Sequence, residues 1–93
     1  MARVVVAATA QQRLAELIIS RSLPDTTRAR VQRALVPFAL FPRLGRELTG
    51  RWSPFRVILG PWPWMLIIYR YDETADVVTV ATIVDARTAT APS

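Results

Sequence analysis

The chain has 93 residues and a formal net charge of +5, and it contains neither cysteine nor histidine. These two absences exclude disulfide bonds, thiolate chemistry, and the most common side-chain metal ligand and general base. The 7 acidic residues are scattered without metal-ligand spacing, so we expect no metal and no cofactor. The length suits one domain, which could bury roughly two thirds of its unfolded surface.

Every one of the 12 basic residues is arginine, a pattern that codon usage in a GC-rich genome can produce by itself. The planar guanidinium also suits phosphate and carboxylate groups, so the charge favours an acidic partner, either nucleic acid or an acidic protein segment. The N-terminus lacks the apolar core of a signal peptide, and the longest apolar run, 62–69, is far too short to span a membrane. We therefore expect a soluble, cytoplasmic protein.

The N-terminal half indicates one strand and two helices. The β-branched run 3–7 predicts a strand, and Thr9 then fits the N-cap of a helix near 9–22. A second helix is expected near 26–40, kinked or irregular at Pro37 because proline disrupts a helix interior. The short connection predicts an antiparallel helical hairpin. The apolar stripe of the second helix consists of Val31, Ala34, Leu35, Phe38 and Phe41.

The C-terminal half indicates a sheet. A turn-rich loop with room for one short strand or bridge precedes three predicted strands at 55–59, 64–71 and 77–85. Their short connections predict an antiparallel meander. We expect an α+β fold in which the helical hairpin covers one face of a four-stranded antiparallel sheet that includes the N-terminal strand. The domain should span 1–88, and 89–93 should be a disordered tail.

Strand alternation predicts an apolar surface on the sheet face that the helices leave open. An exposed apolar patch rimmed by arginine is typical of an interaction site, although loops, the tail or a second copy of the chain could also cover it. The expected patch consists of Ile58, Trp64, Leu66, Ile68 and Ile83, with Arg56, Arg70 and Arg87 around it.

The order of these elements and two stretches, "FPRLGRELTG" and the closing "VILGPWPWMLIIYRYDETADVVTVATIVDAR", resemble the RelE/ParE superfamily of bacterial toxins. The resemblance covers about residues 3–88. Its characteristic residues are matched by Pro42, Gly45, Leu48, Gly50, Arg56, Tyr69 and the triplet Asp85-Ala86-Arg87.

The resemblance implies the toxin of a type II toxin–antitoxin pair, a bacterial growth inhibitor that a cognate antitoxin covers. RelE-like members cut mRNA on the ribosome, and Arg56 and Arg87 match two basic positions of that active site. However, Leu66 stands where a strand arginine is expected, no lysine or histidine can serve as a base, and no tyrosine follows Arg87. The catalytic set is therefore incomplete, and whether the chain is an enzyme stays open.

ParE-like members instead inhibit DNA gyrase through a protein contact, and this sequence favours that branch. The alternatives are ribosome-dependent mRNA cleavage and a non-toxic, arginine-rich nucleic-acid-binding homologue. A homodimer or a toxin–antitoxin hetero-oligomer is equally compatible with the pattern. The residues that we expect to bind a partner are Arg56, Trp62, Trp64, Leu66, Arg70, Asp85 and Arg87.

Overall fold

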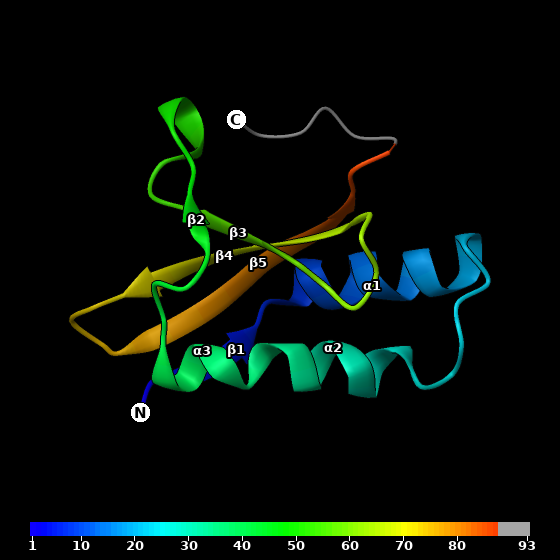
Figure 1. The fold of residues 1–93 in the computed structure, drawn as a ribbon, viewed down its shortest axis with the longest axis horizontal. Helices are drawn as coiled ribbons and strands as arrows, with labels where there is room; N and C mark the ends of the chain where they lie inside the picture. The colour runs from blue at the N-terminus through cyan, green and yellow to red at the C-terminus, as the bar shows by residue number, and fades with distance from the viewer. Residues whose placement is uncertain (88–93) are drawn as a thin grey trace.

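The computed structural model describes residues 1–87, and the tail expected at 89–93 lies outside them. Within this range the helices form one layer against a five-stranded sheet of order β1-β5-β4-β3-β2 (Figure 1). The helices are α1 (Ala8–Ser20), α2 (Thr27–Leu35) and α3 (Pro37–Leu40), with a 3₁₀ turn at Gly50–Trp52. The strands are β1 (Arg3–Val6), β2 (Arg46–Glu47), β3 (Arg56–Leu59), β4 (Met65–Asp72) and β5 (Val77–Asp85).

This architecture confirms the predicted α+β class, the helical hairpin and the antiparallel meander. Two details differ from the expected four-stranded antiparallel sheet. β1 runs parallel to β5, with Val4 opposite Val78 and Val6 opposite Val80. The helices and the rest of the sheet lie between these two strands in the sequence and provide the long connection that a parallel pair requires. The short strand β2 adds a fifth member at the other edge, where it pairs with β3.

Pro37 divides the second predicted helix, as its sequence position suggested. Proline has no backbone N–H to donate inside a helix, but it is well tolerated in the first turn of one. Accordingly α2 ends at Leu35 and α3 begins at Pro37. The predicted N-cap at Thr9 is wrong: α1 begins at Ala8, and Ala7 occupies the cap position without a side-chain hydrogen bond.

A β-bulge reverses the side-chain alternation of β5. Tyr69 is paired with Val80, but Ile68 is paired with Thr82, so Ala81 is an extra residue. After this bulge Ile83 and Asp85 face the helices, as do Val78 and Val80 before it. The prediction that Ile83 lies on the open face was wrong because strict alternation cannot anticipate an inserted residue.

The core lies between the helices and the inner face of the sheet. Ile58 is opposite Ile67 in the register and faces this core, which corrects its predicted place on the open face. The ring centroids of Phe38 and Tyr69 are 4.8 Å apart, and both side chains are fully buried. The fully or largely buried apolar residues of this core include Ala10, Leu14, Leu17, Val31, Leu35, Phe38, Met65, Ile67, Tyr69, Val78, Val80 and Ile83.

Candidate functional site

The residues that the sequence indicated for partner binding do not form one surface. They lie in three regions: Arg56 near β2, Leu66 and Arg70 on the open sheet face, and Trp62, Trp64, Asp85 and Arg87 where β4 begins and β5 ends. Each region has a different chemical character.

Arg56 ties the loop before β2 to the sheet. Its guanidinium donates hydrogen bonds to the carbonyl oxygens of Gly45, at 2.9 Å, and Arg43, at 3.3 Å. It also forms a salt bridge with Glu47 of β2, at 3.8 Å. In the register Arg56 is opposite Tyr69, so it lies on the helix side of the sheet and not on the open face as expected.

The open face has a hollow of about 390 Å³ near the middle of the sheet. Arg70 lies at this hollow, is exposed, and forms no salt bridge within residues 1–87. Ile68 is only 1% exposed and Leu66 is half-buried, so the broad apolar patch that we expected on this face is absent. The residues lining the hollow are Ala7, Phe55, Arg70, Asp72, Thr79 and Ala81.

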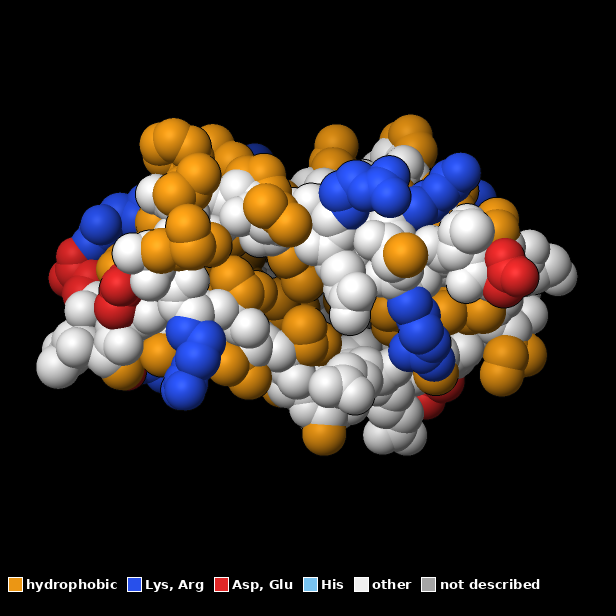
Figure 2. Space-filling model, turned by 90° about the horizontal axis from the view of Figure 1, so that it is seen from below, with side chains coloured by type: hydrophobic (Ala, Val, Ile, Leu, Met, Phe, Trp, Pro, Cys, Tyr) orange, Lys and Arg blue, Asp and Glu red, His pale blue; other side chains and the backbone are white. Residues whose placement is uncertain are grey.

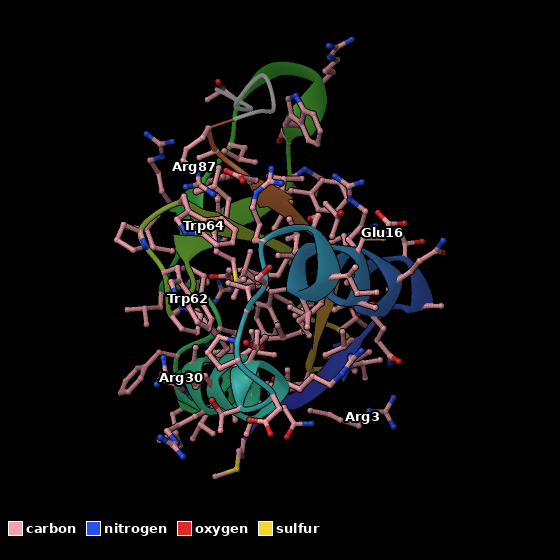
Figure 3. The ribbon with its side chains drawn as sticks, turned by 90° about the vertical axis from the view of Figure 1, so that its right-hand side faces the viewer. Arg3, Glu16, Arg30, Trp62, Trp64 and Arg87 are labelled. Atoms are coloured by element: carbon pink, nitrogen blue, oxygen red, sulfur yellow. The ribbon has the colours of Figure 1, made fainter. Side chains whose placement is uncertain are left out.

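The third region is a row of two neighbouring aromatic rings with an arginine at each end, which we call the arginine–tryptophan column: Arg87, Trp64, Trp62 and Arg30. The Arg87 guanidinium lies 4.6 Å from the centroid of the Trp64 ring, and Trp64 lies 6.3 Å from Trp62. At the other end Arg30 of α2 lies 5.5 Å from Trp62. Figure 3 shows the four side chains one above another along one side of the molecule. Both tryptophans pack against the edge of the core, which corrects the placement of Trp64 on the open face.

Asp85 holds the upper end of this column. Its carboxylate accepts hydrogen bonds from the Arg87 guanidinium at 3.0 and 3.1 Å and from Arg21 at 2.8 Å. The side chain is only 2% exposed. The hydrogen bonds from Arg87, with a further contribution from Arg21, hold the pKa of this carboxyl well below its ordinary value of 3.8. Asp85 is therefore charged at neutral pH and links Arg21, at the C-terminal end of α1, to β5.

This geometry separates the two arginines that matched a ribonuclease. Arg56 is opposite Tyr69 and Asp85 is opposite Met65, so Arg56 and Arg87 are about 13 Å or more apart along β4. Both face away from the open side of the sheet. Tyr69 is buried, and this burial raises the pKa of its hydroxyl. These three side chains cannot surround one phosphate without a large rearrangement.

The sequence interpretation missed an exposed apolar surface at the end of the helical layer. We call Val36, Leu40, Phe41 and Leu44 the α3 patch; these side chains are 59–64% exposed. Phe41 was wrongly assigned to the core stripe. The sequence does hold a signal for this exposed surface. Val36 and Leu40 lie four residues apart, so they share one side of the helical segment, and that side is not the one that carries Val31, Leu35 and Phe38.

An apolar groove of about 370 Å³ lies beside the α3 patch, between β1 and the end of α2. Figure 2 shows this hollow, with hydrophobic side chains around it. β1 is an edge strand, so the groove lies where the sheet and the helical layer part. The groove is lined by Ala2, Val4, Val6, Gln32, Leu35, Val36 and Ala39.

Two negative findings apply to residues 1–87. No group of three or more acidic side chains is placed to hold a metal ion in this range. None of its helices is long and apolar enough to cross a membrane.

Comparison with solved structures identifies the fold. A copper-bound mutant toxin from Helicobacter pylori superimposes with a TM-score of 0.71 and 15% identity, over 94% of this chain and 97% of the other. A chain of the toxin–antitoxin complex RelBE2 from Mycobacterium tuberculosis matches with a TM-score of 0.67 and 21% identity, over 90% and 96% of the two chains. The chain has the fold of RelE-type toxins.

A third similar structure is the conserved hypothetical protein HP0892 of Helicobacter pylori, with a TM-score of 0.64 and 10% identity over 94% of this chain and 97% of the other. No protein-family model matches the sequence, and no curated protein matches it significantly. The likeness is therefore one of fold, and the predicted resemblance to the RelE/ParE superfamily is confirmed at that level.

Proposed function

We propose that the chain is the toxin of a bacterial type II toxin–antitoxin system, a cytoplasmic growth inhibitor that a cognate antitoxin neutralises. The proposal is supported by the fold, which matches a toxin and a chain of a toxin–antitoxin complex along almost their whole lengths. It also explains why so small a chain exposes so much apolar surface.

The observation that carries the proposal is the α3 patch with its neighbouring groove. Four large apolar side chains are more than half exposed within nine consecutive residues, 36–44. A soluble monomer gains nothing from such an arrangement, whereas a protein partner can bury it at about 25 cal/mol per Å² of apolar area. The antitoxin is the partner that we propose for this surface.

Replacing Phe41 by serine tests this assignment. The Phe41 ring is 62% exposed, so the change should leave the fold intact. Removing a large aromatic contact from a protein interface often costs 2 kcal/mol or more, so we expect the dissociation constant for the antitoxin to rise about thirtyfold. The measurement is calorimetry with the protein encoded beside the chain's own gene.

Ile19→Ser is the matched control. Ile19 on α1 is 80% exposed and lies outside the α3 patch, so its loss removes a similar apolar group from a different surface. Equal weakening by the two substitutions would argue against the α3 patch as the binding site. If the wild-type chain neither binds that protein nor slows growth when expressed, the toxin proposal itself fails.

For the mechanism we favour inhibition of DNA gyrase through a protein contact, as in the ParE branch. Arg56 and Arg87, the two arginines that matched a ribonuclease, are engaged in contacts that build the fold. Leu66 and Arg70 are the residues that we propose for target contact on the open face. Trp62, Trp64 and Asp85 would act indirectly, by holding the edge of that surface in shape.

One observation keeps mRNA cleavage as a second candidate. Arg70 lies at the hollow of the open face with Thr79 beside it, and a free guanidinium there could hold a phosphate. If the chain cleaves mRNA on the ribosome, Arg70→Ala should lower the rate about a hundredfold, by analogy with the loss of one transition-state donor. Under the gyrase mechanism there is no cleavage for this substitution to remove.

A further inference from the structure

A second pocket, distinct from the groove, lies where α2 meets the turn between β3 and β4. It has a volume of about 430 Å³ and is lined by Arg30, Arg33, Ala34, Gly60 and Pro61. Positions three residues apart lie on the same side of a helix, so α2 presents both guanidinium groups to this pocket. We call it the Arg30–Arg33 pocket.

The positive charge of this pocket has no acidic partner among residues 1–87. Neither Arg30 nor Arg33 forms a salt bridge within residues 1–87, and both are exposed. By contrast, Arg21, Arg56 and Arg87 are each paired with a carboxylate. The pocket therefore offers two guanidinium groups to an anionic group of another molecule.

Arg30 is held in place before any ligand arrives. It lies over Trp62, and Figure 3 shows Trp62 between Trp64 and Arg30. The far end of the column is anchored by the double contact of Arg87 with the buried Asp85. A side chain fixed in this way loses less conformational entropy on binding, which favours affinity.

The same packing distinguishes between two kinds of anionic partner. Proteins that bind single-stranded nucleic acid stack bases on open aromatic faces. Trp62 has Arg30 on one side and Trp64 on the other, so both sides of its ring already have a neighbour. The remaining walls, Ala34 and Pro61, are apolar and suit an aliphatic side chain. This combination fits a peptide that carries carboxylates beside an apolar residue.

We propose that the Arg30–Arg33 pocket binds an acidic segment of a protein partner, with glutamate or aspartate carboxylates on the two guanidinium groups and an apolar side chain against Ala34 and Pro61. The identity of that partner as the antitoxin rests on the proposed function. The chemistry of the pocket does not, so it can be tested by itself.

The test is a titration of the ¹⁵N-labelled full chain with a synthetic peptide of alternating glutamate and leucine, followed by NMR. We expect shifts at the backbone amides of Arg30 and Arg33 and at the indole of Trp62. Loss of one charge-assisted contact by Arg33→Ala should raise the dissociation constant about tenfold or more. Trp62→Leu should also weaken binding, although every arginine remains.

Arg28→Ala is the matched control, because Arg28 is exposed on the same helix and does not line the pocket. It should change the dissociation constant by less than about threefold, as a rim charge does. Equal weakening by Arg28→Ala and Arg33→Ala would overturn the proposal in favour of diffuse attraction. Tighter binding of a uridine oligonucleotide of equal charge at the same residues would overturn it in favour of nucleic acid.

The two proposals fail in different ways. Suppose that the wild-type chain does not bind the protein encoded beside its own gene but does bind the acidic peptide at this pocket. This result would refute the antitoxin as the partner and retain the pocket as a binding site. A chain that binds both the antitoxin and the acidic peptide with equal affinity before and after Arg33→Ala would refute the site and retain the antitoxin.

Discussion

At the scale of single residues, Asp85 has the most perturbed environment. Its carboxylate is buried and bonded to Arg87 and Arg21, so its pKa is lower in the folded chain than in the unfolded one. A lowered folded pKa contributes stability above the unfolded value of 3.8, and this contribution is lost as the pH falls through the acid range. This one charge anchors both Arg87 of the column and Arg21 at the end of α1.

Asp85→Asn keeps the shape of the side chain and removes the charge. We expect the variant to be clearly less stable than the wild type at pH 7, and the difference to shrink below about pH 4 as the carboxyl of the unfolded wild-type chain becomes protonated. Urea unfolding at pH 7 and pH 3 measures it. Glu16→Gln is the control, because its exposed pair with Arg13 is worth only about 0–1 kcal/mol. A difference between Asp85→Asn and wild type that stays constant with pH would contradict this account.

At the scale of elements, the loop before β2 makes a close contact with β4 at Gly45. The backbone N–H of Gly45 donates to the Tyr69 hydroxyl at 2.7 Å. A methyl group on Gly45 would lie 2.7 Å from the Tyr69 hydroxyl oxygen and 2.9 Å from Ile58 Cγ2, too close for any real contact. Glycine is therefore required here for space.

Gly45→Ala should destabilise the chain by about 1–3 kcal/mol through overpacking, and Tyr69→Phe by a similar amount through the unpaired N–H. A Gly45→Ala loop that shifts to relieve the clash also breaks the hydrogen bond to Tyr69, so in the double variant that bond is lost only once and the two costs should not add. A double-mutant cycle of unfolding free energies reports this coupling. Additive costs would mean that the loop accommodates the methyl group with this hydrogen bond intact.

Most of the helices and strands could be predicted from the sequence, but the β-bulge in β5 could not. The helices, the break at Pro37 and the three meander strands follow from local periodicity and backbone chemistry. The bulge at Ala81 does not, because an inserted residue depends on the pairing of β4 with β5. It placed Ile83 and Asp85 on the inner face and so removed Ile83 from the expected open-face patch.

The candidate site was harder to predict for the same reason. Trp62, Trp64 and Arg87 were noted as binding residues, but their stacking with Arg30 joins segments far apart in the sequence. The exposure of Leu40 and Leu44 does not follow from the sequence alone, because the boundary between core and surface at α3 depends on how the helix restarts after Pro37.

At the scale of the whole molecule, the two layers offer two separate surfaces. The α3 patch, the groove and the Arg30–Arg33 pocket involve the helical layer, whereas Arg70 and its hollow lie on the open side of the sheet. An antitoxin could therefore bind the helical layer while the target binds the sheet. Under this arrangement, the antitoxin would neutralise the chain in one of two ways. Its bulk would block the target sterically, or an arm of the antitoxin would cover the open face.

We propose that this chain inhibits a protein target by contact and does not cut RNA. The most direct measurement assays the purified wild-type chain in parallel for gyrase supercoiling and for ribosome-dependent mRNA cleavage. We predict saturable inhibition of supercoiling with mRNA left intact on the ribosome. Robust, codon-periodic cleavage of mRNA with unaffected gyrase would contradict the claim.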